Sequence, residues 1–464
     1  MRPLGEFEEV RRWISGVANG SRCFWDARYW EGTSTRVVVE DGVVKSVGFH
    51  ESRGVGIRVL ESGGWGFAST SRLERGDVEG AFNLAKKLAG RVQGNCPDLP
   101  ERDPVERRFQ VPVLRDVADV EPEQKVAFLL ERDGAAREFD SRVASTRFTY
   151  TDLRGTSGFV DSDSVCLLTS ESFVLFTGKV VAKSGGALQA GSRVMGGPGG
   201  WEVLAEKGAD RAGEECAREA VQLLGAAPPP SGKHVVVVDP SLCGTFVHEA
   251  VGHASEADLV LAGNSILKGK LGERVAAECV TVVDDATAAK SAGFYFHDSE
   301  GERGRRNVVV ERGILRSYLH SRETAARAEI APTANGRATS HLFPPLPRMS
   351  NTSLEPGDHS LEELIDVREG LLAEDWVYGY ADPGSGMFSF KVKRARWIRR
   401  GELGGLVRDA AVSGNTREVL LSITGVGREV RRTDGTCVKN GQSVPVGDAG
   451  VHARVEKLLV GGRW

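Results

Sequence analysis

The sequence lacks any apolar stretch approaching the roughly 18 consecutive residues that a membrane-spanning helix requires. Its first residues mix charges of both signs and have no apolar core of the kind found in signal peptides. These two absences argue against membrane insertion and secretion. The sequence therefore predicts a cytoplasmic protein.

Paired cysteines are also missing. The seven cysteines are scattered along the chain, and none forms a Cys-x-x-Cys pair. An odd and dispersed set argues against a disulfide framework or a zinc ribbon. Most of these cysteines are expected to be small buried apolar side chains.

The chain has no basic excess, since its formal net charge is −4. Dedicated nucleic-acid binders normally carry a strong surplus of lysine and arginine. A nucleic-acid partner is therefore not expected. Two local basic runs, at residues 303–306 and 391–400, are interpreted as solvated strand and turn faces.

Glycine, by contrast, is abundant at 57 residues, which favours many turns and strand ends over a helical bundle. The N-terminal half alternates between strand and helix patterns. A hairpin with Asp41-Gly42 as its turn is expected at residues 36–47. Further strands are predicted at residues 54–60, 65–70 and 143–181, and helices at 76–88, 123–139 and 206–224.

A proline-rich connector follows at residues 225–233 and provides the clearest domain boundary. Beyond it, short strands separated by glycine, aspartate and asparagine dominate, including segments 388–392 and 395–398. We therefore predict an α+β protein of two domains. Residues 1–228 form a mixed α/β domain, and residues 229–464 form a β-rich, mostly antiparallel and barrel-like domain.

The second domain begins with a motif whose residue types can bind a metal ion and accept a proton. Residues 235–238 predict a buried strand, and a helix capped by Ser241 is expected after it. This helix carries His248, Glu249 and His253. Two imidazoles can hold a metal ion, and the carboxylate can accept a proton from water.

The spacing of the two histidines is His-Glu-x-x-x-His, and it has a geometric consequence. In an ideal α-helix, residues i and i+5 lie about 140° apart around the axis, so His248 and His253 would point to different faces. A π-bulge would return both to one face, and such bulges occur often at functional sites. Gly252, which has no Cβ, is expected to ease this distortion.

A catalytic metal site needs a third protein ligand and an open position for water. Glu256 is expected near the same helix face, either as a ligand or as a support for one. The sequence offers several further candidates: His297, His320, His341, His359, Asp258 and Cys437.

The sequence as a whole resembles the TldD/PmbA family, proposed metalloproteases first described as modulators of DNA gyrase. The segments that carry the resemblance are Gly54-Val-Gly-Ile-Arg-Val, His248-Glu-Ala-Val-Gly-His-Ala-Ser-Glu-Ala-Asp, Tyr318-Leu-His-Ser-Arg-Glu-Thr-Ala, Arg348-Met-Ser-Asn-Thr-Ser-Leu-Glu-Pro-Gly-Asp and Gly435-Thr-Cys. They follow the family order across nearly the whole chain.

This resemblance implies a metal-dependent peptidase that acts on unfolded polypeptides or peptide leaders. His248 and His253 match the histidine ligands of the family, Cys437 matches its thiolate ligand, and Glu249 matches its catalytic carboxylate. The implied metal is Zn²⁺ or Fe²⁺. Relatives work with a PmbA-like partner subunit or as homodimers, and this chain resembles the TldD-type, catalytic half.

One departure from the family pattern follows the cysteine, where Val438 replaces the usual glycine; this loss is expected to tighten the turn. An alternative to the enzyme also stays open. The chain could be a non-enzymatic regulatory protein of the gyrase-modulator type, with a closed four-ligand site that holds the metal only for structure.

Overall fold

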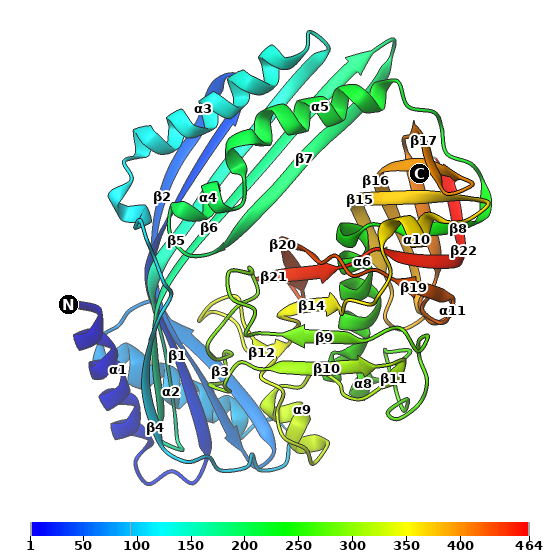
Figure 1. The fold of residues 1–464 in the computed structure, drawn as a ribbon. Helices are drawn as coiled ribbons and strands as arrows, with labels where there is room; N and C mark the ends of the chain where they lie inside the picture. The colour runs from blue at the N-terminus through cyan, green and yellow to red at the C-terminus, as the bar shows by residue number, and fades with distance from the viewer. Residues whose placement is uncertain (1, 93, 463–464) are drawn as a thin grey trace.

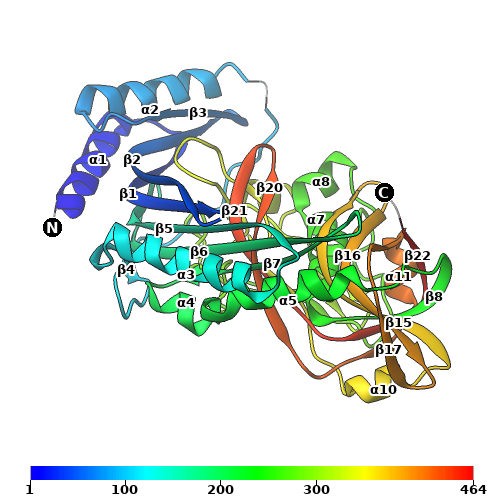
Figure 2. The same ribbon diagram turned by 90° about the horizontal axis from the view of Figure 1, so that it is seen from above.

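The computed structural model describes residues 2–92 and 94–462 and has the predicted α+β architecture. A long N-terminal sheet lies beside a C-terminal region built from two larger sheets and a short β-ribbon (Figures 1 and 2). No helix within the described ranges is both long and apolar enough to cross a membrane.

The N-terminal sheet is mostly antiparallel, and its short strand β4 pairs in parallel with β6. Its order is β3-β2-β1-β5-β6-β4, with β7 also paired to β6. Asp41 and Gly42 form the predicted turn between the first two strands, with φ angles of 51° and 77°. The strands are β1 (Phe24–Glu40), β2 (Val43–Glu61), β3 (Gly64–Thr70), β4 (Val105–Gln110), β5 (Val143–Asp161), β6 (Val165–Ser184) and β7 (Ala187–Pro198).

Helices cover this sheet in two groups, each over its own core (Figure 1). At one end, α1 (Arg2–Ala18) and α2 (Arg75–Ala89) pack on β1, β2 and β3. At the other end, the covering elements are α3 (Pro122–Phe139), α4 (Glu202–Glu206) and α5 (Ala212–Leu224). The helices predicted at residues 76–88 and 123–139 and the predicted N-terminal strands are confirmed, apart from small shifts at their ends. The helix predicted at residues 206–224 is wrong in its first part: Gly208, with a φ angle of 79°, interrupts it, and α5 begins only at Ala212.

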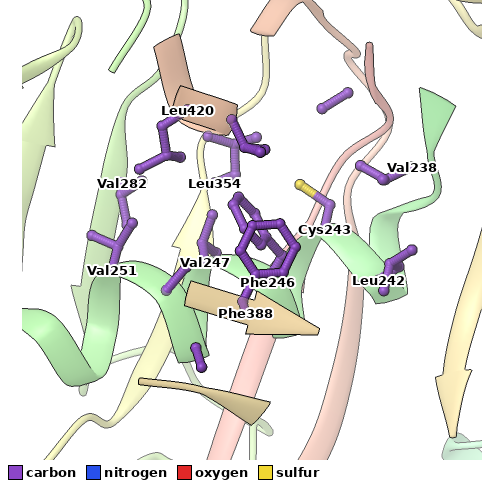
Figure 3. Packing of buried hydrophobic residues seen from close by; sticks show 14 of the residues in the cluster. Val238, Leu242, Cys243, Phe246, Val247, Val251, Val282, Leu354, Phe388 and Leu420 are labelled. Carbon is purple, nitrogen blue, oxygen red and sulfur yellow. The ribbon is translucent and has the colours of Figure 1, made fainter. Parts of the chain in front are cut away.

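After the connector, the chain forms a closed β-barrel. The strand order is β15-β8-β22-β18-β16-β17, and β15 also pairs with β16, which closes the sheet. Helix α6 (Pro240–Val247) packs Phe246 against Phe388 and Phe390 of this barrel (Figure 3). The strands are β8 (Gly232–Val238), β15 (Glu369–Ala381), β16 (Met387–Arg399), β17 (Glu402–Val407), β18 (Ala410–Asn415), β19 (Ile423–Val426, paired with β22) and β22 (Ala453–Gly462).

The other large C-terminal sheet has the order β11-β10-β9-β14-β21-β20, so β20 lies at its edge. Its strands are β9 (Val282–Asp285), β10 (Arg306–Glu311), β11 (Ile314–Leu315), β14 (Asn351–Leu354), β20 (Arg431–Lys439) and β21 (Gln442–Gly450). The short ribbon pairs β12 (Gly336–Arg337) with β13 (Leu346–Pro347). The remaining short α-helices are α7 (His253–Ser255), α8 (Ala257–Ala262), α9 (Arg322–Arg327), α10 (Leu361–Ile365) and α11 (Thr416–Leu421).

Two sequence expectations about the barrel are wrong. Segments 388–392 and 395–398 belong to one continuous strand, β16. The basic run within it is not simply solvated, because Lys393 is only 7% exposed and its ammonium lies 2.6 Å from the Asp375 carboxylate. Arg394 is paired with Glu374 at 3.2 Å. The charge of Lys393 is therefore neutralised inside the protein, whereas Arg399 and Arg400, at the end of the run, are exposed as predicted.

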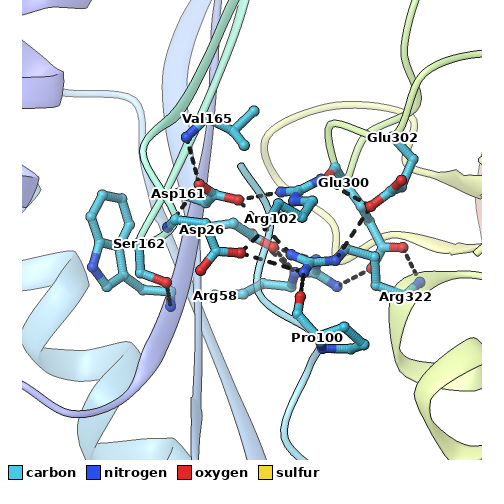
Figure 4. Close-up of polar contacts among 12 residues, drawn as sticks. Asp26, Arg58, Pro100, Arg102, Asp161, Ser162, Val165, Glu300, Glu302 and Arg322 are labelled. Atoms are coloured by element: carbon cyan, nitrogen blue, oxygen red, sulfur yellow. Dashed lines mark hydrogen bonds and ion pairs between the residues drawn. The ribbon is translucent and has the colours of Figure 1, made fainter. Parts of the chain in front are cut away.

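Buried ion pairs join the N-terminal sheet to the C-terminal region (Figure 4). Arg58 pairs with Asp26 on its own sheet and lies 3.0 Å from Glu300 across the boundary. Arg102 likewise contacts Asp161 and, at 3.0 Å, Glu302. Removing one partner from such a buried pair leaves an uncompensated charge, so these contacts hold the two regions together.

A second connection is made by residues 338–345, which we call the strap. Arg28 on β1 donates hydrogen bonds to the strap carbonyls of Ser340 and Phe343. A Cβ added at Gly54 would lie 2.3 Å from Nε2 of His341, and one at Gly56 would lie 2.0 Å from the His341 carbonyl oxygen. The Gly-Val-Gly segment therefore provides room for the strap. The domain division at residue 228 stays a prediction.

Candidate metal centre

The helix that leads to the predicted ligands begins directly after β8, with one residue, Asp239, between them. Asp239, and not Ser241 as the sequence predicts, is its N-cap, because its carboxylate accepts a hydrogen bond from the backbone N–H of Leu242 at 2.9 Å. The Ser241 hydroxyl donates instead to Asp375 on β15, at 2.8 Å. Pro240 precedes Ser241 at the first helical position, where its missing N–H costs nothing.

The predicted π-helical distortion is present. Residues His248–Gly252 form one turn of π-helix, closed by a hydrogen bond from the backbone N–H of His253 to the carbonyl of His248. The two imidazole centroids lie 5.3 Å apart, with their planes at 88°. The extra residue in the turn thus brings both histidines to one face, as their spacing requires.

Gly252 has a different role from the one expected. Its φ and ψ angles, −57° and −59°, are accessible to any residue, so the distortion does not depend on a glycine. A Cβ at this position would lie 2.0 Å from the sulfur of Met349. Glycine is therefore needed for close packing beside the π-turn.

Cys437 lies on β20, three residues before the turn that leads into β21. That turn is Asn440-Gly441, with φ angles of 50° and 73°. Val438 is outside it, paired with Ser443 in the extended ladder, and its side chain is 66% exposed. The expectation that Val438 tightens the turn is therefore wrong.

The structure brings His248, His253 and Cys437 together. Their candidate ligand atoms all lie within 4.8 Å of one another. Among the described residues, this triplet is the group of histidine, cysteine or carboxylate side chains arranged closely enough to hold a metal ion. The Cys437 sulfur is 3.4 Å from Nε2 of His253.

The remaining candidates contact other groups: His297 contacts Thr169, His320 contacts Thr324, His341 lies in the strap, His359 contacts Val426, and Asp258 contacts Lys439.

Each imidazole is held from behind by a carboxylate. Glu256 lies 3.0 Å from Nδ1 of His253, which gives it the supporting role that the sequence left open. Asp448 lies 2.9 Å from Nδ1 of His248. Such contacts fix the tautomer and leave Nε2 of both rings for a metal. Sequence reasoning missed Asp448, because no local spacing relates this β21 residue to the helix.

Electrostatics favour the metal-binding form of the thiol. Burial alone would raise the pKa of Cys437, but its hydrogen bonds with His248 and His253 outweigh burial and lower the pKa to about 5. Burial would lower the pKa of His253, whereas Glu256 and Cys437 raise it to about 10. At neutral pH the cysteine is thus a thiolate, the form that ligates metals.

A cleft of about 1040 Å³ lies between the N-terminal sheet and the C-terminal region, and His248 is the residue of the cluster that lines it. Glu249 and His248 line its wall, and the Oε2 atom of Glu249 lies 3.8 Å from Nε2 of His253. Burial raises the pKa of Glu249, and the two nearby histidines oppose this increase. Strands β7, β15 and β20 and helix α5 provide most of the other lining residues.

Comparison with known proteins places this site in a family. The PmbA/TldA metallopeptidase C-terminal domain matches residues 231–462, which include all four predicted site residues. Domain 1 of the same metallopeptidases matches residues 25–89, and their central domain matches residues 115–226. The chain belongs to the PmbA/TldD family.

Relatives in this family share most of its length. A metalloprotease of Methanothermobacter thermautotrophicus is 39% identical over 94% of this chain and 95% of its own. A metalloprotease TldD homolog of Haemophilus influenzae is 30% identical, with 92% and 90% covered. A zinc metalloprotease TldD homolog of Saccharolobus solfataricus is 28% identical, with 95% and 96% covered. The family resemblance inferred from the sequence is therefore confirmed.

Solved structures share the fold at lower identity. A Thermotoga maritima protein named as a proposed modulator of a DNA gyrase superimposes with a TM-score of 0.82 and 23% identity, covering 98% of this chain and all of its own. TldE from Thermococcus kodakarensis gives a TM-score of 0.78 and 18% identity, with 98% and 100% covered. Family membership and the names of the relatives support a metalloprotease that uses a metal cofactor.

Proposed function

We propose that this chain is a metal-dependent peptidase that hydrolyses peptide bonds in unfolded polypeptides or peptide leaders. The observation that carries the proposal is the convergence of His248, His253 and Cys437 beside Glu249 on the wall of an open cleft. Three protein ligands leave a coordination position for water or substrate, which is the arrangement of catalytic zinc sites.

The donor set fits such a metal. Both imidazoles present Nε2, each backed by a carboxylate at Nδ1, and the thiolate is stabilised at neutral pH. A thiolate favours Zn²⁺ or Fe²⁺ over the hard cations Mg²⁺ and Ca²⁺. We propose His248, His253 and Cys437 as the ligands of Zn²⁺, with Fe²⁺ as the alternative.

In the proposed reaction, Glu249 is the general base. The metal, when bound, would polarise the scissile carbonyl and acidify a water molecule. Glu249 accepts the proton from the attacking water on a carboxylate oxygen and then delivers it to the leaving amine nitrogen. Its raised pKa suits both halves of this transfer, since a general acid–base works best when its pKa lies near the working pH.

The edge of β20 suggests how an unfolded substrate is held. Lys439 and Gln442 form the hydrogen-bonded pair next to a two-residue turn. Because bonding direction alternates along a strand, the backbone of Cys437 also bonds to β21, whereas the N–H and C=O groups of Val438 and Thr436 point away from β21. Within the described chain, no strand pairs with this outer edge. An extended peptide added here would lie beside Cys437 without any demand on its side chains.

The decisive test is Glu249→Gln, assayed on a reduced, unfolded polypeptide by release of new amino termini. We expect metal content to be retained and cleavage to fall by at least about 100-fold. The exposed Glu418→Gln on α11 is the matched control and should retain full activity. Full activity in Glu249→Gln would refute the proposed role.

The competing function is a non-enzymatic regulatory protein of the gyrase-modulator type with a structural metal. Chelator-sensitive cleavage by the wild type would exclude it, whereas a fourth protein ligand and no cleavage would support it. Metal analysis of Cys437→Ser tests whether Cys437 is a metal ligand, separately from whether the chain is an enzyme. Metal lost in that variant places Cys437 in the site, whichever function is correct.

We also propose a cytoplasmic location and an assembly with a PmbA/TldE-like partner subunit or as a homodimer. The similarity of the fold to TldE supports such an assembly. Co-purification of the tagged chain from its own cells would identify the partner. Recovery of the chain alone, as a monomer, would count against both forms of assembly.

A further inference from the structure

The cleft beside the metal centre is lined by apolar side chains as well as charged ones. Several of its charged groups neutralise one another: Arg193 lies 2.8 Å from Glu219, and Lys207 lies 2.9 Å from Asp434. Groups that are already paired provide little selectivity for a charged substrate. Some apolar lining residues, in contrast, leave about half of their surface exposed, and they come from both walls of the cleft.

On the wall formed by the N-terminal sheet, the apolar surface consists of Leu175 on β6 and Val194 on β7. Val194 pairs with Thr177 across the two strands, and Leu175 lies two residues before Thr177, so all three share one face of the sheet. Phe176 points to the opposite face, into the core beneath the helices. Val194 is 49% exposed. Strand β7 lies on the side of the sheet nearest the C-terminal region (Figure 1).

On the other wall, the apolar surface is formed at a bulge in β15. The pairing of β15 with β16 shifts between Trp376 and Tyr378, which leaves Val377 as an extra residue. In a regular strand successive side chains point to opposite faces, but a bulge can direct two neighbours to the same side. Trp376 and Val377 both line the cleft, and Val377 is 49% exposed.

The bulge is fixed to the helix that leads to the metal ligands. Asp375, which precedes Trp376, has a φ angle of 57°, an uncommon value for a residue other than glycine. Its backbone N–H donates to Asp239 at 2.9 Å, and its carboxylate accepts from the Ser241 hydroxyl at 2.8 Å. Both partners lie at the start of α6. Backbone strain of this kind persists only where the surroundings hold it, and it is concentrated at active sites and ligand-binding sites.

We propose that Leu175, Val194, Trp376 and Val377 form an apolar subsite that binds a large apolar side chain of the substrate. The proposal rests on the peptidase function proposed above and specifies which segments are cleaved best. Pairing along the β20 edge places no demand on side chains, so the subsite supplies a preference that the edge does not. Large apolar side chains are exposed in unfolded chains and buried in folded ones, which suits an unfolded substrate.

The contacts of the bulge also define where the subsite lies relative to the general base. Ser241, which bonds to Asp375, precedes Glu249 by eight residues, and eight residues of helix span about 12 Å. An extended peptide advances about 3.3 Å per residue. The preferred apolar residue therefore lies three or four positions from the scissile bond.

Mapping of cleavage sites tests this position. A reduced, unfolded polypeptide is digested, and each new terminus is identified by mass spectrometry. Bonds with a large apolar residue three or four positions away should be cleaved about tenfold faster than bonds with a polar residue there. The preference should disappear in Val377→Asn and in Val194→Asn. Val47→Asn, on β2 and outside the cleft lining, is the matched control at 50% exposure and should retain it.

Cleavage by the wild type without this preference, or with a preference for acidic residues, would overturn the subsite and leave the peptidase function intact. Absence of any cleavage would instead count against the peptidase function. The two failures are therefore distinguishable.

A binding measurement tests the subsite without cleavage. Two dye-labelled peptides of glycine, serine and asparagine, which differ only in a central leucine or asparagine, are titrated with the Glu249→Gln protein and followed by fluorescence anisotropy. The leucine peptide should bind about tenfold more tightly. Adding Val377→Asn should make the two affinities equal, whereas adding Val47→Asn should not. Equal affinities in Glu249→Gln alone, or no detectable binding of the leucine peptide, would overturn the proposal.

Discussion

Arg348 donates a hydrogen bond through Nη2 to the backbone carbonyl oxygen of Cys437, at 2.7 Å. Its Nη1 donates to the carbonyl of Gln442 at 3.1 Å, and its Nε lies 3.8 Å from Glu256. The guanidinium is completely buried. One side chain thus connects the strand that carries the thiolate to the carboxylate that supports His253.

Replacing Arg348 with lysine should loosen the metal centre without removing any ligand. A single ammonium cannot reproduce the planar fork that reaches both carbonyls. We expect metal affinity to fall by about 10- to 100-fold, the range typical for loss of a ligand support. Competition with a chelator of known affinity measures it. Exposed Arg306→Lys is the control, and equal affinities in both variants would refute this role.

Asp448→Asn probes the support behind His248. The amide keeps the shape of the carboxylate but removes the charge that holds the imidazole, and metal affinity should fall by about 10- to 100-fold. Asp358→Asn, on an exposed loop, should leave affinity unchanged. The midpoint of metal loading measures the effect. If Asp448→Asn bound metal as tightly as the wild type, the contact between Asp448 and His248 would not contribute to metal affinity.

Gly252→Ala should destabilise the protein through overpacking, because the new Cβ would approach the Met349 sulfur. The expected cost is about 1–3 kcal/mol. Gly76→Ala on α2 is the control: its Cβ meets nothing within 4 Å, and alanine there should be neutral or stabilising. Chemical denaturation gives both values. A neutral Gly252→Ala would show that Met349 simply moves aside.

His320 should make stability depend on pH. Burial lowers its pKa to about 4, whereas the unfolded side chain titrates near its ordinary value. Protons therefore bind the unfolded state preferentially below that ordinary value, and stability falls as the pH drops toward 4. From pH 7 to pH 5 the loss from His320 should be about 2 kcal/mol.

Denaturant titrations at these two pH values, on the wild type and on His320→Gln, measure the His320 contribution by difference. The variant should lose less stability between the two pH values, even if it is less stable overall. A pH dependence identical to that of the wild type would show that His320 is already protonated in the folded protein or accessible to solvent.

Local patterns predicted the local structure well. The Asp41-Gly42 turn follows from residues that tolerate positive φ, and the π-turn follows from the five-residue spacing of His248 and His253. Non-local contacts could not be predicted in this way. Asp448 reaches His248 only because β21 lies beside the helix in three dimensions.

The errors have the same physical origin. Lys393 lies in the middle of β16, where a charged residue suggests a strand end, yet Asp375 compensates its charge inside the fold. At the helix start, Asp239 took the capping position because Ser241 found a partner on β15. In both cases the carboxylate of Asp375, which is distant in the sequence, decided the outcome. Reasoning from neighbouring residues in the sequence cannot identify it.

The strap has a consequence for how this protein can evolve. Gln442 fixes it at both ends, accepting from the Thr339 N–H at 3.1 Å and donating to the Pro344 carbonyl at 3.0 Å. Between these points it fills the space left by Gly54 and Gly56. Gln442 also accepts from Arg348. The metal centre therefore cannot be moved into another protein with the C-terminal half alone. A recombinant protein with only that half would contain the metal ligands but not the surface of the N-terminal sheet against which the strap packs.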